Sequence, residues 1–284
     1  MIQVNCSMSF FSERLKLSTP LPHREGSGEG PWLGCFLDYL FPRYCPICNR
    51  RLVRTEHSVC TSCLLSLPRI AYHGEGEDEA SLAATDEPSS QGRGMAQHGV
   101  IERHFWGKVP IERATSGFRY DCEQVRTLVH AFKYHQQPHL AADLAAVLAD
   151  HLLATDFFQG VDALLPLPLH WRRLWRRGYN QSEYIARGIA RRTRLPVLRG
   201  VVRRTVDNPS QTRLTRYDRE QNVAHIFAVT QPQRLAGRHI LLVDDVMTTG
   251  ATLLSCMSAM QGIPDLRLSV LTLAYAGMIK PELV

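Results

Sequence analysis

The sequence lacks any long uninterrupted apolar stretch. A membrane-spanning helix needs about 18 to 20 consecutive apolar residues, whereas the most apolar segment, 140–154, is interrupted by Asp143 and Asp150. The N-terminal residues also lack the basic start and apolar core that characterise a secretory signal. We therefore expect a soluble, cytoplasmic protein without a membrane span.

A disulfide framework is also missing. The chain has eight cysteines, but four of them form two C-x-x-C pairs and the other four are scattered along the sequence. Paired cysteines of this kind are typical of metal binding in a reducing cytoplasm, whereas exported proteins distribute cysteines for cross-links. The sequence therefore favours a metal site over disulfides.

The two pairs predict a structural zinc site. Cys45-Pro-Ile-Cys48 and Cys60-Thr-Ser-Cys63 supply the four thiolates that Zn²⁺ binds tetrahedrally, and binding would fold a segment that has little apolar surface of its own. The alternative is a redox C-x-x-C motif, which is less favoured because neither pair lies in a βαβ context. His57 could replace one ligand, although a solvated loop histidine is the simpler interpretation.

The length of 284 residues allows one α/β domain near 200 residues with a small appendage. Residues 1–30 show no periodicity and are interpreted as a flexible leader, or as the product of a start codon placed too early. A short amphipathic helix over 32–41 and the zinc module fill 31–70. Residues 71–110 form an acidic low-complexity insertion, and 111–284 form the main domain.

Strands and helices alternate along the main domain. The expected strands cover 114–120, 162–168, 201–204, 225–229, 240–243 and 266–275, and the expected helices cover 125–133, 139–154, 181–194 and 253–260. This alternation predicts an α/β fold with a mostly parallel sheet flanked by helices, in which 162–168 is the first core strand. Ligands of such sheets collect at the carboxyl ends of the strands.

The most informative stretch is HILLVDDVMTTGATLL, residues 239–254. The apolar run Ile240–Val243 predicts a strand that is covered on both faces, and Gly250 predicts a tight turn that opens a helix. Free backbone N–H groups at such a helix start, together with threonine hydroxyls, form a cradle for a phosphate. The residues of this cradle are Thr248, Thr249, Gly250, Ala251 and Thr252.

Two carboxylates precede this turn. Asp244 and Asp245 would repel a phosphate, so they need a different partner within reach, and ribose hydroxyls or a hydrated Mg²⁺ meet that need. A loop that binds phosphate on one side and a diol on the other predicts a ribose 5-phosphate ligand. The alternative is structural: an aspartate that caps a threonine-rich helix start.

The segment 169–192 is strongly basic and contains two tryptophans. Arginines can bind a polyanion through bidentate hydrogen bonds, and tryptophans offer faces for stacking; the formal net charge of +6 also favours anionic partners. A pyrophosphate or a nucleic-acid backbone would satisfy this segment. The alternative is a solvated basic face with the tryptophans packed inward. The residues concerned are Trp171, Arg172, Arg173, Trp175, Arg176 and Arg177.

A polar loop over 205–223 follows. It has neither helical nor strand periodicity, and long loops of this kind in compact domains are usually lids or disordered. Its arginines, Arg213, Arg216 and Arg219, could close over a bound anion.

The motif VDDVMTTGAT resembles the signature of type I phosphoribosyltransferases, which use phosphoribosyl pyrophosphate (PRPP). The four-cysteine module, PLPLHWRRLWRRGYNQSEYIA, and the residues Gln211 and Asn222 extend the resemblance, from about Trp32 to the C-terminus, to the ComF/GntX family of bacterial proteins associated with DNA uptake and competence. The resemblance implies a type I phosphoribosyltransferase-like sheet and the following roles. Asp244 and Asp245 are the catalytic acids that hold ribose and Mg²⁺, the turn 248–252 holds the 5-phosphate, and the loop carrying Arg172, Arg173 and Arg177 faces the pyrophosphate.

Two hypotheses from different classes follow. As an enzyme, the chain would transfer the phosphoribosyl group of PRPP to an unknown acceptor. As a binding module, it would keep the fold for binding single-stranded DNA or a partner in the DNA-uptake machinery. The residues contain no readable code for the acceptor.

Overall fold

The computed structural model describes residues 42–53, 55–70, 72, 99, 101–206 and 226–277. The expected leader, the helix expected over 32–41, residues 73–98 of the acidic insertion and the arginines of the expected lid lie outside the described residues. The site, the sheet and the four cysteines lie within them.

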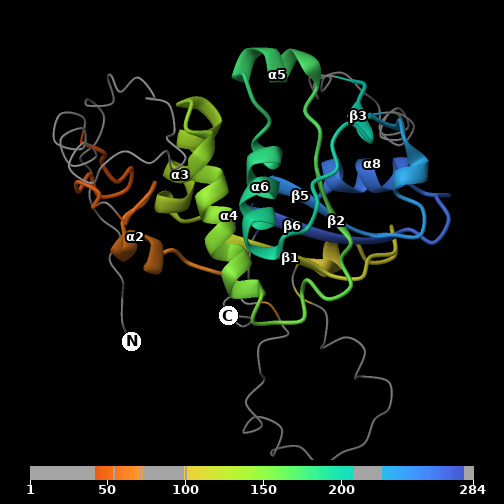
Figure 1. Cartoon of the computed structure of the whole chain (residues 1–284), viewed down its shortest axis with the longest axis horizontal. Helices are drawn as coiled ribbons and strands as arrows, with labels where there is room; N and C mark the ends of the chain where they lie inside the picture. The colour runs from red at the N-terminus through yellow and green to blue at the C-terminus, as the bar shows by residue number, and fades with distance from the viewer. Residues whose placement is uncertain are drawn as a thin grey trace, which may run out of the picture.

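A four-stranded parallel sheet forms the centre of the main domain (Figure 1). Its strands are β1 (Ala114–Arg119), β2 (Ala163–Pro166), β5 (His239–Met247) and β6 (Arg267–Tyr275), in the spatial order β1-β6-β5-β2. Every pairing between them is parallel. The prediction of a mostly parallel sheet is confirmed, although β2 lies at one end of the strand order and the last strand, β6, lies in its middle.

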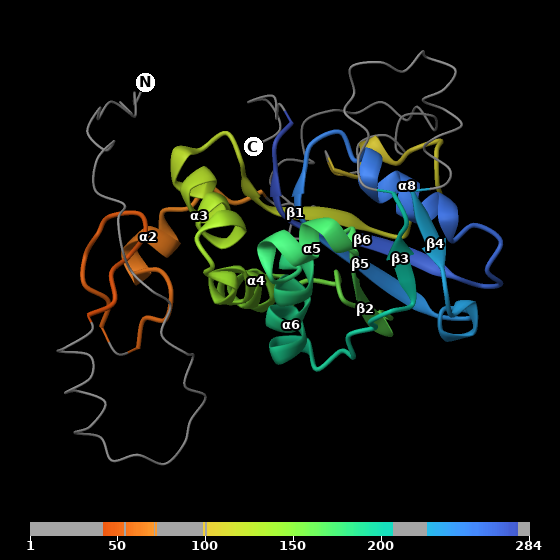
Figure 2. The same cartoon turned by 90° about the horizontal axis from the view of Figure 1, so that it is seen from above.

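Helices cover both faces of this sheet (Figure 2). Helices α3 (Glu123–Tyr134), α4 (Pro138–Leu152) and α6 (Gln181–Thr193) lie on one face, and α8 (Ala251–Ala259) lies on the other. These four helices agree with the sequence predictions to within a few residues at each end. The three-layer arrangement explains why the strands are apolar on both sides.

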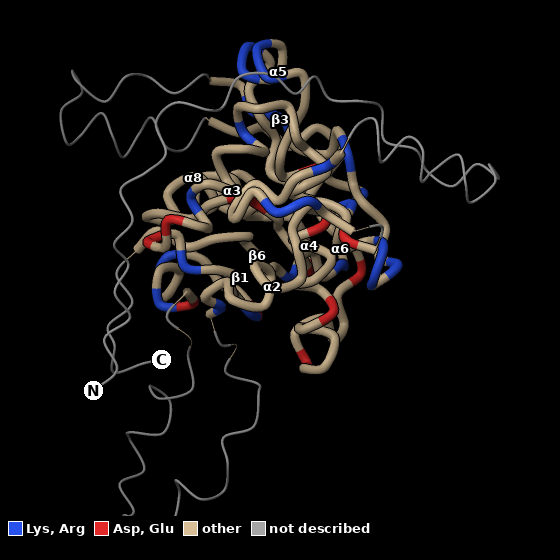
Figure 3. Tube along the Cα trace, turned by 90° about the vertical axis from the view of Figure 1, so that its left-hand side faces the viewer, with Lys and Arg blue, Asp and Glu red and all other residues tan. Residues whose placement is uncertain are grey.

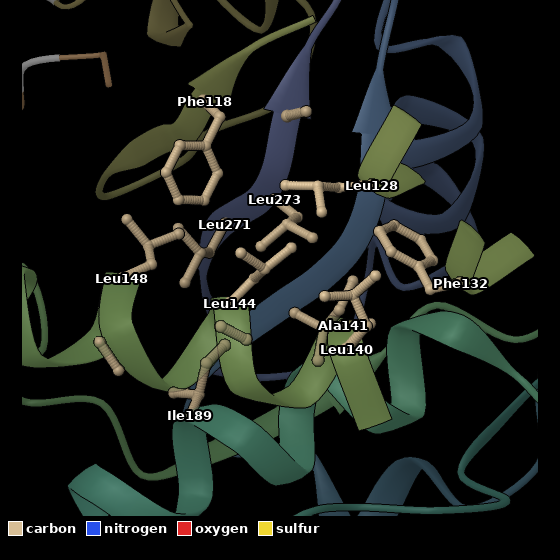
Figure 4. Packing of buried hydrophobic residues seen from close by; sticks show 14 of the residues in the cluster. Phe118, Leu128, Phe132, Leu140, Ala141, Leu144, Leu148, Ile189, Leu271 and Leu273 are labelled. Atoms are coloured by element: carbon tan, nitrogen blue, oxygen red, sulfur yellow. The ribbon is translucent and has the colours of Figure 1, made fainter. Parts of the chain in front are cut away.

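The apolar run of β5 divides between two cores. Leu241 and Val243 belong to the cluster that contains α3, α4 and α6, whereas Ile240 and Leu242 belong to the cluster that contains α8. All four side chains are fully buried, and burial of each such side chain stabilises the fold by about 1.5 to 3 kcal/mol. Figure 4 shows the first cluster, in which leucines of α4 and β6 interdigitate with aromatic rings from β1 and α3.

Helices α4 and α6 approach each other closely at Gly188. A Cβ atom at this position would lie 2.1 Å from the backbone oxygen of Ala142, so a side chain there would force the two helices apart. The close contact fixes the position of α6 relative to α4. It thereby fixes the start of α6, which carries one of the site residues described below.

The remaining described elements are short. Strands β3 (Val202–Arg204) and β4 (Phe227–Val229) pair antiparallel as a separate two-stranded sheet. Two 3₁₀ turns, η1 (Glu102–His104) and η2 (Pro232–Arg234), and helix α2 (Thr61–Leu65) of the cysteine module complete this group.

The cysteine module is continuous with the main domain. The segment that leaves it runs antiparallel to β1, because Ile70 N–H donates to Gly117 O at 3.0 Å and Arg119 N–H donates to Pro68 O at 3.0 Å. Apolar residues of the module also join the same buried cluster as α3 and α4. The module therefore packs as part of the domain.

The segment after β2 differs from the prediction. Residues Trp171–Arg177 form a helix, α5, where a loop was expected. His170 Nδ1 accepts a hydrogen bond from Arg172 N–H at 3.4 Å at the start, and Gly178, with φ of 80°, ends the helix in the left-handed conformation. The helix contains no buried residue, so it has no apolar periodicity by which the sequence could have revealed it.

Candidate functional site

The acidic pair lies at the carboxyl end of β5. The strand continues to Met247, so Asp244 and Asp245 lie among the last four residues of the strand and not after its end. Asp244 is in register with Thr272 of β6, and the preceding residue, Val243, is in register with Pro166 of β2. The carboxyl end of β2 therefore lies beside the acidic pair, as the parallel arrangement predicts.

Asp244 is held by the start of α6. Ser182 Oγ donates a hydrogen bond to Asp244 Oδ1 at 3.0 Å, and the backbone N–H of Asp245 donates to the same oxygen at 2.8 Å. Burial and the neighbouring Asp245 carboxylate raise the pKa of Asp244 to about 7, against the smaller opposing effects of these hydrogen bonds. Asp244 therefore lacks enough positive charge around it to be fully ionised at neutral pH.

Asp245 has a different partner. Lys133 Nζ, from the last turn of α3, lies 2.9 Å from Asp245 Oδ2, and both side chains are mostly buried, with 18% and 14% of their surfaces exposed. The sequence analysis did not assign Lys133 a role. Its position near the end of an apolar helix gave no indication that it would reach a strand so distant in the sequence.

The end of α3 also contacts the segment that returns from α5. Tyr179 Oη donates to the backbone oxygen of Phe132 at 2.5 Å. On the other side of Lys133, the guanidinium of Arg177 lies 5.4 Å from the ring centre of Tyr134. Three consecutive residues of α3 thus contact Tyr179, Asp245 and the last residue of α5, in that order.

The segments before and after α5 contact each other close to the acidic pair. Asn180 Nδ2 donates a hydrogen bond to Leu167 O at 3.0 Å, which joins the segment that leads into α5 to the segment that follows it. Within the described part of the chain, Arg177 Nε and Gln181 Nε2 are buried donors without a hydrogen-bond partner. Because buried donors are nearly always paired in proteins, these two atoms, in the last residue of α5 and the first residue of α6, are candidates for contact with an anion.

The turn after β5 leads directly into α8. Gly250 adopts φ of 73°, in the left-handed region, and α8 begins at the next residue. Thr248 and Thr249 are exposed, and Thr249 Oγ1 accepts a hydrogen bond from Ala251 N–H at 3.4 Å. The first N–H groups of a helix have no intrahelical partner, so the turn presents donors at the same edge as the acidic pair.

Residues that precede β1 pack against this turn. A Cβ atom on Gly250 would lie 3.8 Å from the ring of Phe105, which is fully buried. The adjacent His104 forms a hydrogen bond of 2.6 Å between its Nε2 and Tyr275 Oη, at the end of β6. The sequence analysis placed 101–110 in the insertion and so missed this support.

Helix α5 carries most of the predicted basic segment away from the sheet (Figures 1 and 3). Trp175 and Trp171 are 86% and 65% exposed, so the alternative in which the tryptophans pack inward is wrong. Arg172 lies over the indole of Trp171, with 5.3 Å between the guanidinium carbon and the ring centre. All three predicted anion-binding arginines belong to α5; Arg177, its last residue, lies beside the end of α3, whereas Arg172 and Arg173 lie in its first turn.

The four predicted metal ligands come together in the cysteine module. The Sγ atoms of Cys45, Cys48, Cys60 and Cys63 all lie within 4.8 Å of one another, and those of Cys48 and Cys60 are 3.6 Å apart. Tetrahedral Zn–S bonds of about 2.3 Å place neighbouring sulfurs about 3.8 Å apart. The cluster therefore fits Zn²⁺. His57 is exposed and is not needed as a ligand.

Glu56 organises the module, and the sequence analysis missed it. Its carboxylate accepts hydrogen bonds from Thr61 N–H at 2.8 Å, from Val53 N–H at 3.1 Å and from Arg50 Nη2 at 2.8 Å. These bonds, led by that of Thr61, lower the pKa of Glu56. The side chain thereby ties together the two cysteine pairs.

Comparisons with known proteins agree with this architecture. Residues 36–73 match the family model of the double zinc ribbon domain, which confirms a structural zinc site. Among the residues that the structure describes, no helix is long and apolar enough to cross a membrane.

Two relatives extend the match beyond the cysteine module. Competence protein F of Haemophilus influenzae is 27% identical over 216 residues, which cover 74% of this chain and 86% of that protein. DNA utilization protein YhgH of Escherichia coli K12 is 33% identical over 128 residues, which cover 44% of this chain and 56% of that protein. The match therefore spans little more than half of the length of YhgH.

A solved structure was also found. The glutamine PRPP amidotransferase of Bacillus subtilis, complexed with ADP and GMP, aligns with a TM-score of 0.36 and 17% identity, over 51% of this chain and 30% of that chain. This similarity is too low to carry an argument about the site.

A parallel sheet flanked by helices, with an acidic pair and a threonine-glycine turn at one strand end, is joined to a double zinc ribbon in this α/β protein. The relatives and the zinc ribbon match together fit a ComF-family protein, the family that the sequence resemblance indicated.

Proposed function

We propose that this chain binds PRPP with Mg²⁺ at the carboxyl end of β5 and serves in DNA uptake or utilization. The observation that carries the proposal is the acidic pair Asp244–Asp245, directly followed by a turn with a left-handed Gly250 and exposed threonines. The names of the two relatives support the biological role.

The residues fit the parts of PRPP in a definite order. The threonine hydroxyls and helix-start N–H groups of the turn bind the 5-phosphate, and the carboxylates bind the ribose hydroxyls. The unpaired buried donors of Arg177, at the end of α5, and of Gln181, at the start of α6, are available to the pyrophosphate. Mg²⁺, which prefers carboxylate and phosphate oxygens, would be held beside Asp244 and Asp245 and would neutralise charge on the pyrophosphate.

The reaction that this arrangement supports is phosphoribosyl transfer. The bond between the anomeric carbon and the pyrophosphate oxygen breaks, and pyrophosphate leaves with the electron pair. A nitrogen of the acceptor forms the new bond to that carbon and loses a proton. The protein contributes orientation of the two reactants and electrostatic stabilisation of the leaving group.

Calorimetric titration of the full-length protein with PRPP tests the proposal. We expect binding that requires Mg²⁺ and that Asp245→Asn abolishes. Asp150→Asn is the matched control, because Asp150 is an acid of α4 with 48% of its side chain exposed. Absence of binding to the wild type would contradict the proposal. Release of pyrophosphate with a panel of purine and pyrimidine bases then separates an enzyme from a protein that only binds PRPP.

The second candidate function is binding of single-stranded DNA through α5. The observation in its favour is the exposure of Trp171 and Trp175 among arginines on a projecting helix. Aromatic faces stack on bases of any sequence, and arginines bind the backbone. This function and PRPP binding are compatible in one protein.

Titration of a labelled single-stranded oligonucleotide between about 50 and 200 mM salt tests this candidate. We expect the double variant Arg172→Gln, Arg176→Gln to bind more weakly and with a smaller salt dependence than the wild type. The matched control is Arg191→Gln, Arg192→Gln, which removes two exposed arginines from the end of α6. Equal effects of the two double variants would count against α5 as the binding surface.

A further inference from the structure

Lys133 occupies the position of a cation beside the acidic pair. Its ammonium lies 2.9 Å from Asp245 Oδ2, and only 18% of its side chain is exposed. Among the residues that the structure describes, Asp244 has no ion-pair partner, and its hydrogen bond from Ser182 is neutral. Within the described ranges, the Lys133 ammonium is therefore the cation paired with this pair of acids.

The surrounding contacts keep the lysine at this place. The residue before it, Phe132, is fully buried and accepts the hydrogen bond of Tyr179. The residue after it, Tyr134, lies under the guanidinium of Arg177. The backbone of Lys133 is thus fixed from both sides, while its long side chain can rotate about its own bonds.

The same contacts place Lys133 next to the expected pyrophosphate. Arg177 and Gln181 carry the unpaired buried donors that fit an anion, and Arg177 contacts the residue that follows Lys133. An ammonium released from Asp245 therefore has a second anionic partner within the same site. A divalent cation at the Asp245 carboxylate would compete with the ammonium, because like charges in such proximity repel.

We propose that Lys133 is a displaceable counter-cation of the PRPP site: it neutralises Asp245 while the site is empty, and it binds an anionic oxygen of PRPP when the divalent cation takes its place. This inference rests on the proposed function. It implies that the metal ion binds poorly alone and well together with PRPP, since PRPP gives the displaced ammonium a new partner.

Two titrations of the full-length protein test the inference. Electron paramagnetic resonance of free Mn²⁺ measures binding of the metal alone, and calorimetry measures binding of PRPP in the presence of Mg²⁺. For Lys133→Gln we expect affinity for Mn²⁺ alone to rise about threefold or more, because its competitor is gone. We expect affinity for PRPP with Mg²⁺ to fall about tenfold or more, because a charged hydrogen bond is lost.

The opposite signs distinguish this role from a structural one. Damage to the end of α3 would weaken both ligands together, and Lys133→Arg, which keeps a cation, should keep the weak wild-type affinity for Mn²⁺ alone. Arg192→Gln is the matched control, since it removes an exposed ion pair of 3.0 Å with Asp150 and should change neither titration.

Each unfavourable outcome has its own meaning. A wild type that fails to bind PRPP with Mg²⁺ overturns the proposed function. A wild type that binds PRPP, combined with a Lys133→Gln variant whose two affinities fall together or stay unchanged, overturns the role of Lys133 alone.

Discussion

Ser182 Oγ donates a hydrogen bond to Asp244 Oδ1 at 3.0 Å, and this bond joins the start of α6 to the acidic end of β5. The serine is 3% exposed. Its hydroxyl stabilises the ionised form of a carboxyl group whose pKa is raised to about 7 by burial and by Asp245. In the proposed function, Ser182 would therefore act on the ligand through Asp244.

Replacing this serine should weaken PRPP binding more than it weakens the fold. We expect Ser182→Ala to lower affinity for PRPP with Mg²⁺ about fivefold to tenfold, as is usual for loss of one hydrogen bond. Calorimetry at pH 7 measures the effect. Ser269→Ala is the control, because Ser269 is fully buried and its hydroxyl pairs with His239, at the opposite end of β5. Equal losses of affinity in both variants would contradict the prediction.

Asp244 should make stability depend on pH. Its pKa is raised in the folded protein, to about 7, above the value of an unfolded chain. The folded state therefore holds the proton more tightly, and stability falls as the pH rises from about 4 to 7. Asp244→Asn cannot lose a proton. We expect its stability relative to wild type to increase by about 2 kcal/mol between pH 5 and pH 8, since one pKa unit corresponds to about 1.4 kcal/mol.

Urea denaturation at the two pH values measures this difference. Asp150→Asn serves as the control and should show no such change, because its carboxyl group lies at the surface beside Arg192. A constant difference in stability between Asp244→Asn and wild type at pH 5 and pH 8 would argue against the raised pKa.

Loss of zinc should destabilise the whole domain. Cys45 and Cys60 belong to the same buried cluster as α3 and α4, so the metal site and the main core share one set of contacts. We expect the purified protein to contain about one zinc per chain. Cys48→Ser should lose the metal and lower the melting temperature by about 10 °C, which corresponds to about 3 kcal/mol for a domain of this size.

Elemental analysis and a thermal melt measure both effects. Cys122→Ser is the control, because Cys122 lies at the start of α3, outside the four-cysteine cluster. Full zinc content in Cys48→Ser, or metal-free wild type after purification under reducing conditions, would contradict the zinc assignment.

Trp175 should matter for nucleic-acid binding and not for stability. The side chain is 86% exposed, so Trp175→Ala should change the free energy of unfolding by less than about 0.5 kcal/mol. If bases stack on the indole, affinity for single-stranded DNA should fall about fivefold or more. Fluorescence anisotropy of a labelled oligonucleotide measures it. Trp106→Ala, which removes a 54% exposed tryptophan outside α5, should leave affinity unchanged.

Local patterns in the sequence predicted most of the secondary structure. Helices α3, α4 and α6 show apolar periodicity, and β5 shows an unbroken apolar run. These patterns arise from burial against neighbouring elements, so each element could be predicted from a short segment of sequence. The site-forming motif belongs to this class: the acidic pair, the turn and the helix start are contiguous between 244 and 252. Their placement at one edge of the sheet follows directly from parallel pairing.

Features without a local pattern could not be read in this way. Helix α5 buries none of its side chains, so the only sequence signals for it are the capping residues at its two ends, His170 and Gly178. The pairing of Lys133 with Asp245 depends on the spatial order of strands and helices, which no short window contains. The central position of β6 is likewise a property of the complete sheet.

The antiparallel segment Pro68–Ile70 beside β1 has a consequence for solubility. It occupies the outer edge of the sheet, where Gly117 O accepts its hydrogen bond. An uncovered edge strand offers unpaired N–H and C=O groups to other chains. The segment that leaves the cysteine module therefore covers this edge, and we expect a chain that fails to acquire zinc to expose β1 and to aggregate more readily.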